Sequence, residues 1–220
     1  NVAERGMAAE VARAAIWVVD TRSGTHRVFA SGLRNPNGMA WASPSAAAAP
    51  VLWTVVNERD EIGSDLVPDY LASIPDGSFF GWPYSYFGQH LDDRVQTQSP
   101  ELVAKARMPD YALGPHTASL GLAFSKSAVW TKPFDNGVFI GQHGSWNREP
   151  RSGYKVIFVP FKAGKPSGEP LNVLTGFVSA DGDAFGRPVG VAMNKRSALL
   201  VADDVGNTIW RVTAATKLRH

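Results

Sequence analysis

The segment Gly121-Leu-Ala-Phe124 decides the fold, because its pattern of glycine, apolar residue, alanine and large apolar residue occurs three times in the chain. Gly38-Met-Ala-Trp41 precedes it and Gly190-Val-Ala-Met193 follows it. After a turn, each copy leads into a strongly apolar strand, at Leu52–Val56, Val138–Gly141 and Leu199–Ala202. The units recur at an irregular spacing of roughly 70 to 80 residues, longer than a usual blade repeat because of insertions.

Further strands extend each unit. Tyr154–Phe161 and Thr208–Thr213 follow two of the apolar strands, and Ile16–Asp20 fits the same third position of an earlier unit. Val28–Gly32 and Val173–Phe177 fit a fourth position. A recurrent four-stranded meander with glycine at strand starts is typical of a β-propeller blade. The sequence therefore predicts an all-β propeller; the alternative is a β-sandwich whose strands resemble one another by chance.

The predicted organisation is one partial propeller domain over residues 1–220. It comprises the third-strand region of one blade at 15–33, a blade with a long insertion at 34–110, a blade at 114–180 and a blade at 186–214. These are about three to four blades, or half of a six-bladed ring, whereas closed propellers typically have four to eight. An open half-ring exposes apolar flanks and strand edges. We therefore expect another chain to cover them, in a homo-oligomer.

Composition narrows the classes of function. The 220 residues are 44% hydrophobic and 19% charged, which indicates a folded globular protein. The net charge of +2 comes without a cluster of Lys and Arg, so no nucleic-acid partner is expected. No apolar run reaches membrane-spanning length, so no membrane partner is expected either. The absence of cysteine excludes disulfides and thiolate chemistry.

The loop Gly141-Gln-His-Gly-Ser-Trp-Asn-Arg148 follows an apolar strand and gathers polar and aromatic groups. Strand ends of this kind are where all-β domains often place a ligand site; the alternative is a decorated loop with a structural histidine. His143 is a candidate general base, because histidine titrates near neutral pH. His116, after a Gly-Pro pair, is the second candidate. Trp146 and Trp82 lie in loops and are candidates for a ligand wall.

Seven segments together resemble the soluble pyrroloquinoline-quinone (PQQ)-dependent glucose/sorbosone dehydrogenase family, with the sorbosone-dehydrogenase-like branch closest and its C-terminal half matched. They are Gly32–Gly38, Leu52–Asp60, Phe80–Pro83, Gly114–Ala118, Gly141–Arg148, Gly186–Gly190 and Val201–Asp204. The resemblance implies a six-bladed propeller with PQQ over its central channel and a bridging Ca²⁺. It also implies a small sugar or aldehyde substrate, oxidised by hydride transfer to the quinone, and a periplasmic or secreted location.

The resemblance also implies roles for individual residues. Arg34 and Asn35 match the family's cofactor-binding pair, Thr117 matches a cofactor-contacting threonine, and Arg187 matches one of two arginines near the C-terminus. Trp146 and Arg148 belong to the loop where the family places a cofactor-contacting cation. The chemistry is suitable, because a planar tricarboxylate favours guanidinium groups and flat apolar walls.

The turn Glu58-Arg-Asp60 falls at the family's calcium loop. Ca²⁺ takes oxygen ligands, which the carboxylates of Glu58 and Asp60 and the carbonyl of Arg59 could supply. The alternative is a solvated charged turn with internal ion pairs. The turn also lacks the Gly-Pro form of the glucose enzymes.

Other departures from the family concern the catalytic groups. The family's catalytic histidine and the aspartate that orients it are expected on a segment before Asn1, and Phe185 stands where many relatives have the first paired arginine. Three functions therefore remain open. The first is a quinoprotein sugar dehydrogenase-like oxidoreductase. The second is a Ca²⁺-dependent lactonase or esterase, in which the metal activates water. The third is a non-catalytic sugar-binding or assembly fragment.

Overall fold

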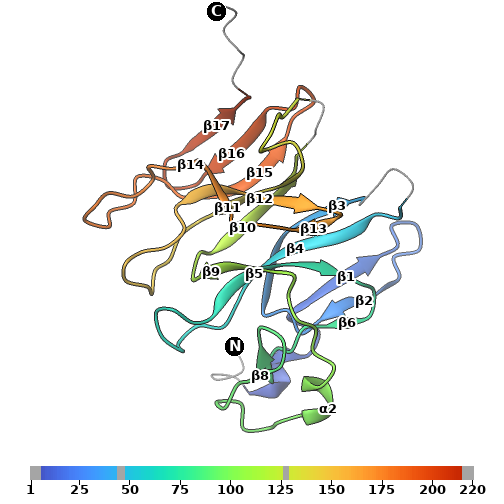
Figure 1. The fold of residues 1–220 in the computed structure, drawn as a ribbon. Helices are drawn as coiled ribbons and strands as arrows, with labels where there is room; N and C mark the ends of the chain where they lie inside the picture. Colours follow the sequence, from blue (N-terminus) through green and yellow to red (C-terminus); the bar gives the residue numbers. More distant parts are fainter. Residues whose placement is uncertain (1–5, 44–47, 126–128, 215–220) are drawn as a thin grey trace, which may run out of the picture.

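A computed structural model describes residues 6–43, 48–125 and 129–214, and the chain is almost entirely β (Figure 1). Its two helical elements, η1 (Met7–Glu10) and α2 (Pro100–Val103), have four residues each. Among the described residues, no helix has the length and apolarity needed to span a bilayer. The predicted all-β class is confirmed.

The strands form four main antiparallel sheets along the chain. The first pairs β1 (Ala15–Val19) with β2 (His26–Ser31), and the short β6 (Ser78–Phe79) adds in parallel to β2. The second has the order β3 (Asn35–Ala42), β4 (Val51–Asn57), β5 (Pro68–Ile74) and β9 (Tyr111–Pro115). Between β6 and β9, the excursion also contains α2 and a small hairpin of β7 (Ser85–Tyr86) and β8 (His90–Leu91).

The third sheet has the order β10 (Ser119–Phe124), β11 (Gly137–Gln142) and β12 (Lys155–Lys162), with β13 (Lys165–Pro166) and β14 (Leu171–Leu174) both pairing with β12. The fourth has the order β15 (Pro188–Met193), β16 (Leu199–Asp203) and β17 (Thr208–Val212). Figure 1 shows the four sheets side by side in chain order.

Apolar cores fill the spaces between successive sheets. One core joins the first sheet to β4 and β5 and contains Tyr70 and Phe80. A second joins the second sheet to the third and contains Trp53 and Ile140. A third joins the third sheet to the fourth and contains Phe158. Each sheet therefore buries its faces against its neighbours, as consecutive blades of a β-propeller-like fold do.

The repeated glycines explain how closely the first strands of successive sheets approach. A Cβ on Gly38 would lie 2.8 Å from the Leu120 carbonyl oxygen on β10. A Cβ on Gly121 would overlap the Val189 carbonyl oxygen on β15 and lie 2.8 Å from the Val191 nitrogen. Only a residue without a side chain allows backbone to meet backbone at this distance. The repeated pattern therefore marks β3, β10 and β15 as neighbouring inner strands.

Asn35–Gly38 belongs to β3, which has a register shift between Pro36 and Met39. Trp17 and Trp210 lie in strands but are 40% and 42% exposed. They lie in β1 and β17, the outermost strands of the first and last sheets. Within residues 6–43, 48–125 and 129–214, no further sheet pairs with these two edge strands.

Gly121→Ala is expected to lower the free energy of unfolding by about 3 kcal/mol, because the new Cβ meets backbone that cannot rotate away. Gly190→Ala is the matched control. It occupies the same position of the repeat but has no atom within 4 Å of the added Cβ, so a change of less than about 0.5 kcal/mol is expected. Urea denaturation measures both, and equal losses would contradict the close approach of β10 and β15.

Candidate functional site

A cleft of about 370 Å³ opens where the strand ends of the second, third and fourth sheets meet. Arg34, His116 and Arg187 lie just before the inner strands β3, β10 and β15, or within three residues of their starts. The loops after β4 and β11 supply Glu58 and His143. In an antiparallel meander, the start of one strand and the end of the next lie at the same edge. The topology therefore gathers these loops at one end of the sheets.

The structure brings most of the predicted site residues together. The residues that line this cleft include Arg34, Asn35, Glu58, Asp60, His116, His143, Trp146 and Arg187. Trp146 is 73% exposed. Four predicted residues are not among the lining residues: Arg59, Trp82, Thr117 and Arg148. Arg148 instead pairs with Asp65 at 2.9 Å.

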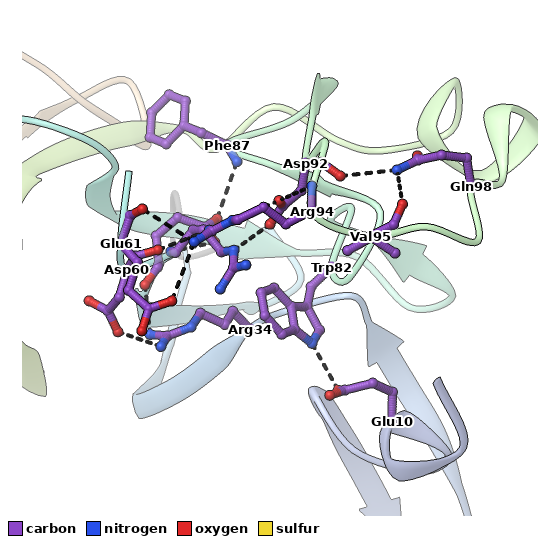
Figure 2. Close-up of polar contacts among 12 residues, drawn as sticks. Glu10, Arg34, Asp60, Glu61, Trp82, Phe87, Asp92, Arg94, Val95 and Gln98 are labelled. Carbon is purple, nitrogen blue, oxygen red and sulfur yellow. Dashed lines mark hydrogen bonds and ion pairs between the residues drawn. The ribbon is translucent and has the colours of Figure 1, made fainter. Parts of the chain in front are cut away.

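Arg34 is fixed by the turn that follows β4. Its Nη1 donates to the Glu58 carbonyl oxygen at 2.6 Å, and its Nη2 pairs with Asp60 at 2.5 Å. Figure 2 shows its guanidinium beside Trp82, 5.9 Å from the centre of the ring. Trp82 is buried, and its Nε1 donates to Glu10 at 2.8 Å. Trp82 therefore supports Arg34 from beneath and does not form the expected ligand wall.

Arg59 turns away from the cleft. Its side chain is buried, lies 5.4 Å from the Trp82 ring centre and pairs with Asp92. Arg94 contacts the same Asp92 and donates from Nη2 to the Asp60 carbonyl oxygen at 3.0 Å (Figure 2). The segment between β6 and β9 thus holds the Glu58–Asp60 turn through Asp92 and Arg94.

Arg187 is a cation without a carboxylate within ion-pair distance among the described residues. Its Nη2 donates to the Tyr154 hydroxyl at 2.9 Å, and its guanidinium lies 4.8 Å from the centre of that ring. Its Nη1 is 3.3 Å from Nδ1 of His143, whose Nε2 is 3.1 Å from Asp204. An aspartate thus orients His143, and Arg187 has charge left for an anionic ligand.

His116 is held between two oxygen acceptors. Its Nε2 lies 2.9 Å from the Gly63 carbonyl oxygen and its Nδ1 lies 3.3 Å from Asp60 Oδ1. Both ring nitrogens therefore face an oxygen atom. Ser145, close to His143 in sequence, forms no pair with it, because the Ser145 hydroxyl accepts the Ser152 N–H at 3.0 Å.

Two of the residues that line the cleft, Glu58 and Asp69, are buried carboxyl groups. Burial raises the pKa of Glu58 to about 7, and burial raises the pKa of Asp69 to about 6. Sequence reasoning found Glu58 but missed Asp69, which lies near the start of β5. The available signal was an acidic residue at a strand position, directly before the buried apolar run of Tyr70 and Leu71.

The donor set for a metal consists of oxygens. No group of three or more His, Asp or Glu residues that could hold a metal ion occurs within residues 6–43, 48–125 and 129–214. However, Oδ1 of Asn57 and Oδ1 of Asn147 are buried acceptors without a hydrogen-bond partner, and both residues line the cleft. Asn147 Nδ2 donates to Asp60 at 3.1 Å. Amide, carbonyl and carboxylate oxygens are the ligands that Ca²⁺ takes, so this set fits Ca²⁺.

Comparison with known proteins gives one family. A family model described as TrAA12-like matches residues 86–215. An uncharacterized protein of Borreliella burgdorferi is 28% identical over 201 residues, covering 90% of this chain and 52% of that protein. A PQQ-dependent pyranose dehydrogenase of Coprinopsis cinerea is 42% identical over 57 residues, which are 26% of this chain and 7% of that protein. The chain spans about half the length of the Borreliella relative.

Solved structures show the same fold. The holo form of the PQQ domain of Coprinopsis cinerea pyranose dehydrogenase matches with a TM-score of 0.70 and 23% identity, covering 93% of this chain and 62% of that domain. A calcium structure of the Trichoderma reesei family AA12 enzyme matches with a TM-score of 0.68 and 19% identity, covering 87% and 54%. The arrangement of sheets is therefore β-propeller-like.

The two buried carboxyls predict how stability depends on pH. Their ordinary pKa values are 4.5 for Glu58 and 3.8 for Asp69, so the folded chain keeps both protons to higher pH than the unfolded chain. Their stabilising contribution is complete below the ordinary values and is lost as pH rises through about 6 and about 7. The Glu58→Gln variant lacks the titration of Glu58. The difference in unfolding free energy, variant minus wild type, should therefore rise by about 3 kcal/mol between pH 4 and pH 8.

Urea denaturation across that pH range measures the effect. Glu169→Gln, at an exposed position outside the cleft, is the control and should run parallel to wild type. A Glu58→Gln curve that also runs parallel to wild type would contradict the proton held by Glu58.

Proposed function

The chain belongs to the TrAA12-like family, and on that premise we propose that its cleft binds PQQ with Ca²⁺ and oxidises a small sugar or aldehyde. One observation carries the proposal: Arg34, His116, His143 and Arg187, which come from three different sheets, face one cleft. Two guanidinium groups and two imidazoles at one place suit an anionic redox cofactor and a proton transfer beside it.

Arg187 and Arg34 are the groups that would hold the cofactor's carboxylates. Arg187 carries no ion pair among the described residues, so a carboxylate at this position meets an uncompensated charge. Arg34 is already paired with Asp60, and Asn35 beside it adds an amide. Thr117 is buried and bonded to Asp69, so it would act from behind the cleft wall. The exposed indole of Trp146 would cover the bound plane at the mouth of the cleft.

Asp60, Asn57 and Asn147 are the residues whose oxygens would hold Ca²⁺. The Asn57 and Asn147 side chains provide acceptors that lack partners, and Asp60 provides a carboxylate. Glu58 is not assigned to the metal, because its carboxyl accepts the N–H groups of Arg59 and Phe87 and its carbonyl oxygen accepts Arg34 Nη1 at 2.6 Å. Arg59 would contribute only backbone, because its side chain is committed to Asp92.

When bound, the quinone would supply a two-electron acceptor for hydride from the substrate C–H bond, with Ca²⁺ as a Lewis acid beside it. The chain's own part would be to take up the proton of the adjacent substrate hydroxyl, so that an alcohol becomes a carbonyl. His143 receives the proton at Nδ1, because Asp204 accepts the hydrogen on Nε2 and so fixes the tautomer. The Arg187 Nη1 contact to Nδ1, at 3.3 Å, would have to open for this proton transfer, because an N–H donor occupies the lone pair that receives the proton.

The four sheets would be consecutive blades, and a second copy of the chain would cover the exposed flanks. β1 has no strand partner on the edge away from β2 among the described residues. A cleft of about 360 Å³ beside β1 is lined by apolar residues, among them the exposed Met39 and Trp41. At the other end, Ile209 on β17 is exposed. Free strand edges beside apolar surface favour association.

The resemblance also supports a periplasmic or secreted location.

The activity is tested by adding PQQ and Ca²⁺ and following dye reduction with aldoses. We expect sugar-dependent reduction that is lost with a chelator and in His143→Ala. Hydrolysis of lactones or esters that depends on the metal, without dye reduction, would contradict the proposal.

Arg187→Ala is expected to weaken PQQ binding by roughly 30- to 100-fold, because one charge-assisted contact contributes about 2 to 3 kcal/mol. Arg211→Ala is the control, since Arg211 is an exposed arginine on β17 that does not line the cleft. Titration of PQQ absorbance or intrinsic fluorescence measures both. Equal affinities of the two variants would place the cofactor elsewhere.

A calibrated mass from light scattering tests the association. We expect a dimer or larger assembly that Trp41→Lys shifts toward the single chain. A strictly monomeric mass of the wild type would contradict a second copy on the flanks.

A further inference from the structure

A network of hydrogen-bonded, buried polar side chains begins at Asp69, which lines the cleft. Asp69 is 3% exposed. Its Oδ1 accepts the Glu58 N–H at 2.9 Å, and its Oδ2 accepts the Thr117 hydroxyl at 3.0 Å and the Ala118 N–H at 2.8 Å. One carboxylate on β5 thus binds the turn after β4 and the turn between β9 and β10.

The hydrogen-bond network continues into the third sheet. The hydroxyls of Thr117 and Ser119 lie 3.0 Å apart, and Gln142 Nε2 donates to the Ser119 hydroxyl at 3.4 Å. Thr117, Ser119 and Gln142 are all buried. Directly after Gln142, the His143 N–H donates to the Ala118 carbonyl oxygen at 2.9 Å. The network therefore connects the three loops that carry Glu58, His116 and His143.

The turn that this network holds has an unfavourable backbone. His116 has φ of 53° and Ala118 has φ of 48°, in the left-handed region that residues with a Cβ rarely adopt. Such residues persist only where their surroundings determine them strongly. Here two of the donors bound by Asp69, the Thr117 hydroxyl and the Ala118 N–H, belong to this same turn.

We propose that Asp69 is the positioning residue of the cleft: through Thr117 and Ala118 it fixes the turn that places His116 against Asp60. Asp69 also fixes the Glu58 end of the turn that carries Asp60, so one carboxylate sets both sides of that contact. The proposal rests on the proposed function only for its activity readout, because the geometry of His116 is measurable without cofactor.

The substitutions separate the effect of losing a hydrogen bond from the effect of changing the volume of a side chain. Asp69→Asn replaces one acceptor oxygen by a donor, which leaves at least one of the three donors without a partner. Thr117→Val removes only the hydroxyl at nearly constant shape, and Thr117→Ser keeps the hydroxyl. Thr54→Val is the matched control, because Thr54 is equally buried and donates to the Gly38 carbonyl oxygen at 3.1 Å, away from the cleft.

The test records the ring N–H signals of ¹⁵N-labelled histidine in the cofactor-free protein, assigned with His116→Gln. We expect Asp69→Asn and Thr117→Val to shift or broaden the His116 signals, and Thr117→Ser and Thr54→Val to leave them as in wild type. In the loaded enzyme, kcat of Thr117→Val should fall roughly 10- to 100-fold with little change in the sugar KM.

Unchanged His116 signals in Thr117→Val, or an equal shift in Thr54→Val, would overturn the proposal. If Asp69→Asn fails to fold, the comparison of Thr117→Val with Thr117→Ser still tests the proposal. If the wild type reduces no dye, the proposed function fails, whereas the histidine signals still decide the role of Asp69.

Discussion

Contact between the backbones of successive inner strands is the constraint on which the rest of the structure depends. Gly38 meets β10 and Gly121 meets β15, and neither approach leaves room for a side chain. At this spacing, loops from neighbouring sheets come within reach of one another. Arg34, His116 and Arg187, which lie before these strands, consequently line one cleft. The glycines are therefore needed both for packing of the sheets and for bringing the cleft residues together.

The charges of the cleft are unevenly compensated. Arg34 is balanced by Asp60, whereas the Arg187 guanidinium has a tyrosine hydroxyl and a histidine as neighbours and, in the part of the chain that the structure describes, no carboxylate within ion-pair distance. Burial raises the pKa of Glu58 to about 7, so near neutral pH this carboxyl adds only part of a negative charge. An anionic ligand is therefore attracted to the Arg187 side of the cleft.

Sequence reasoning predicted the all-β class, because repeated glycines and strand periodicity are local signals, and the family resemblance pointed to Arg34 and Arg187. It did not predict the direction of individual side chains. Arg59 turns toward Asp92, 33 residues away, and Thr117 toward Asp69, 48 residues away, and no local pattern reveals such partners. Asp69 itself was missed because it belongs to a strand, where an acidic residue is normally exposed and here is buried.

A crystal structure with PQQ and Ca²⁺ at saturating concentration would show whether the loops of three sheets form one cofactor site. We expect electron density for the cofactor in the cleft, with a carboxylate against Arg187, Ca²⁺ near Asp60, and His116 and His143 facing the same space. Density at another surface, or an empty cleft whose four cationic and imidazole side chains point in unrelated directions, would contradict it.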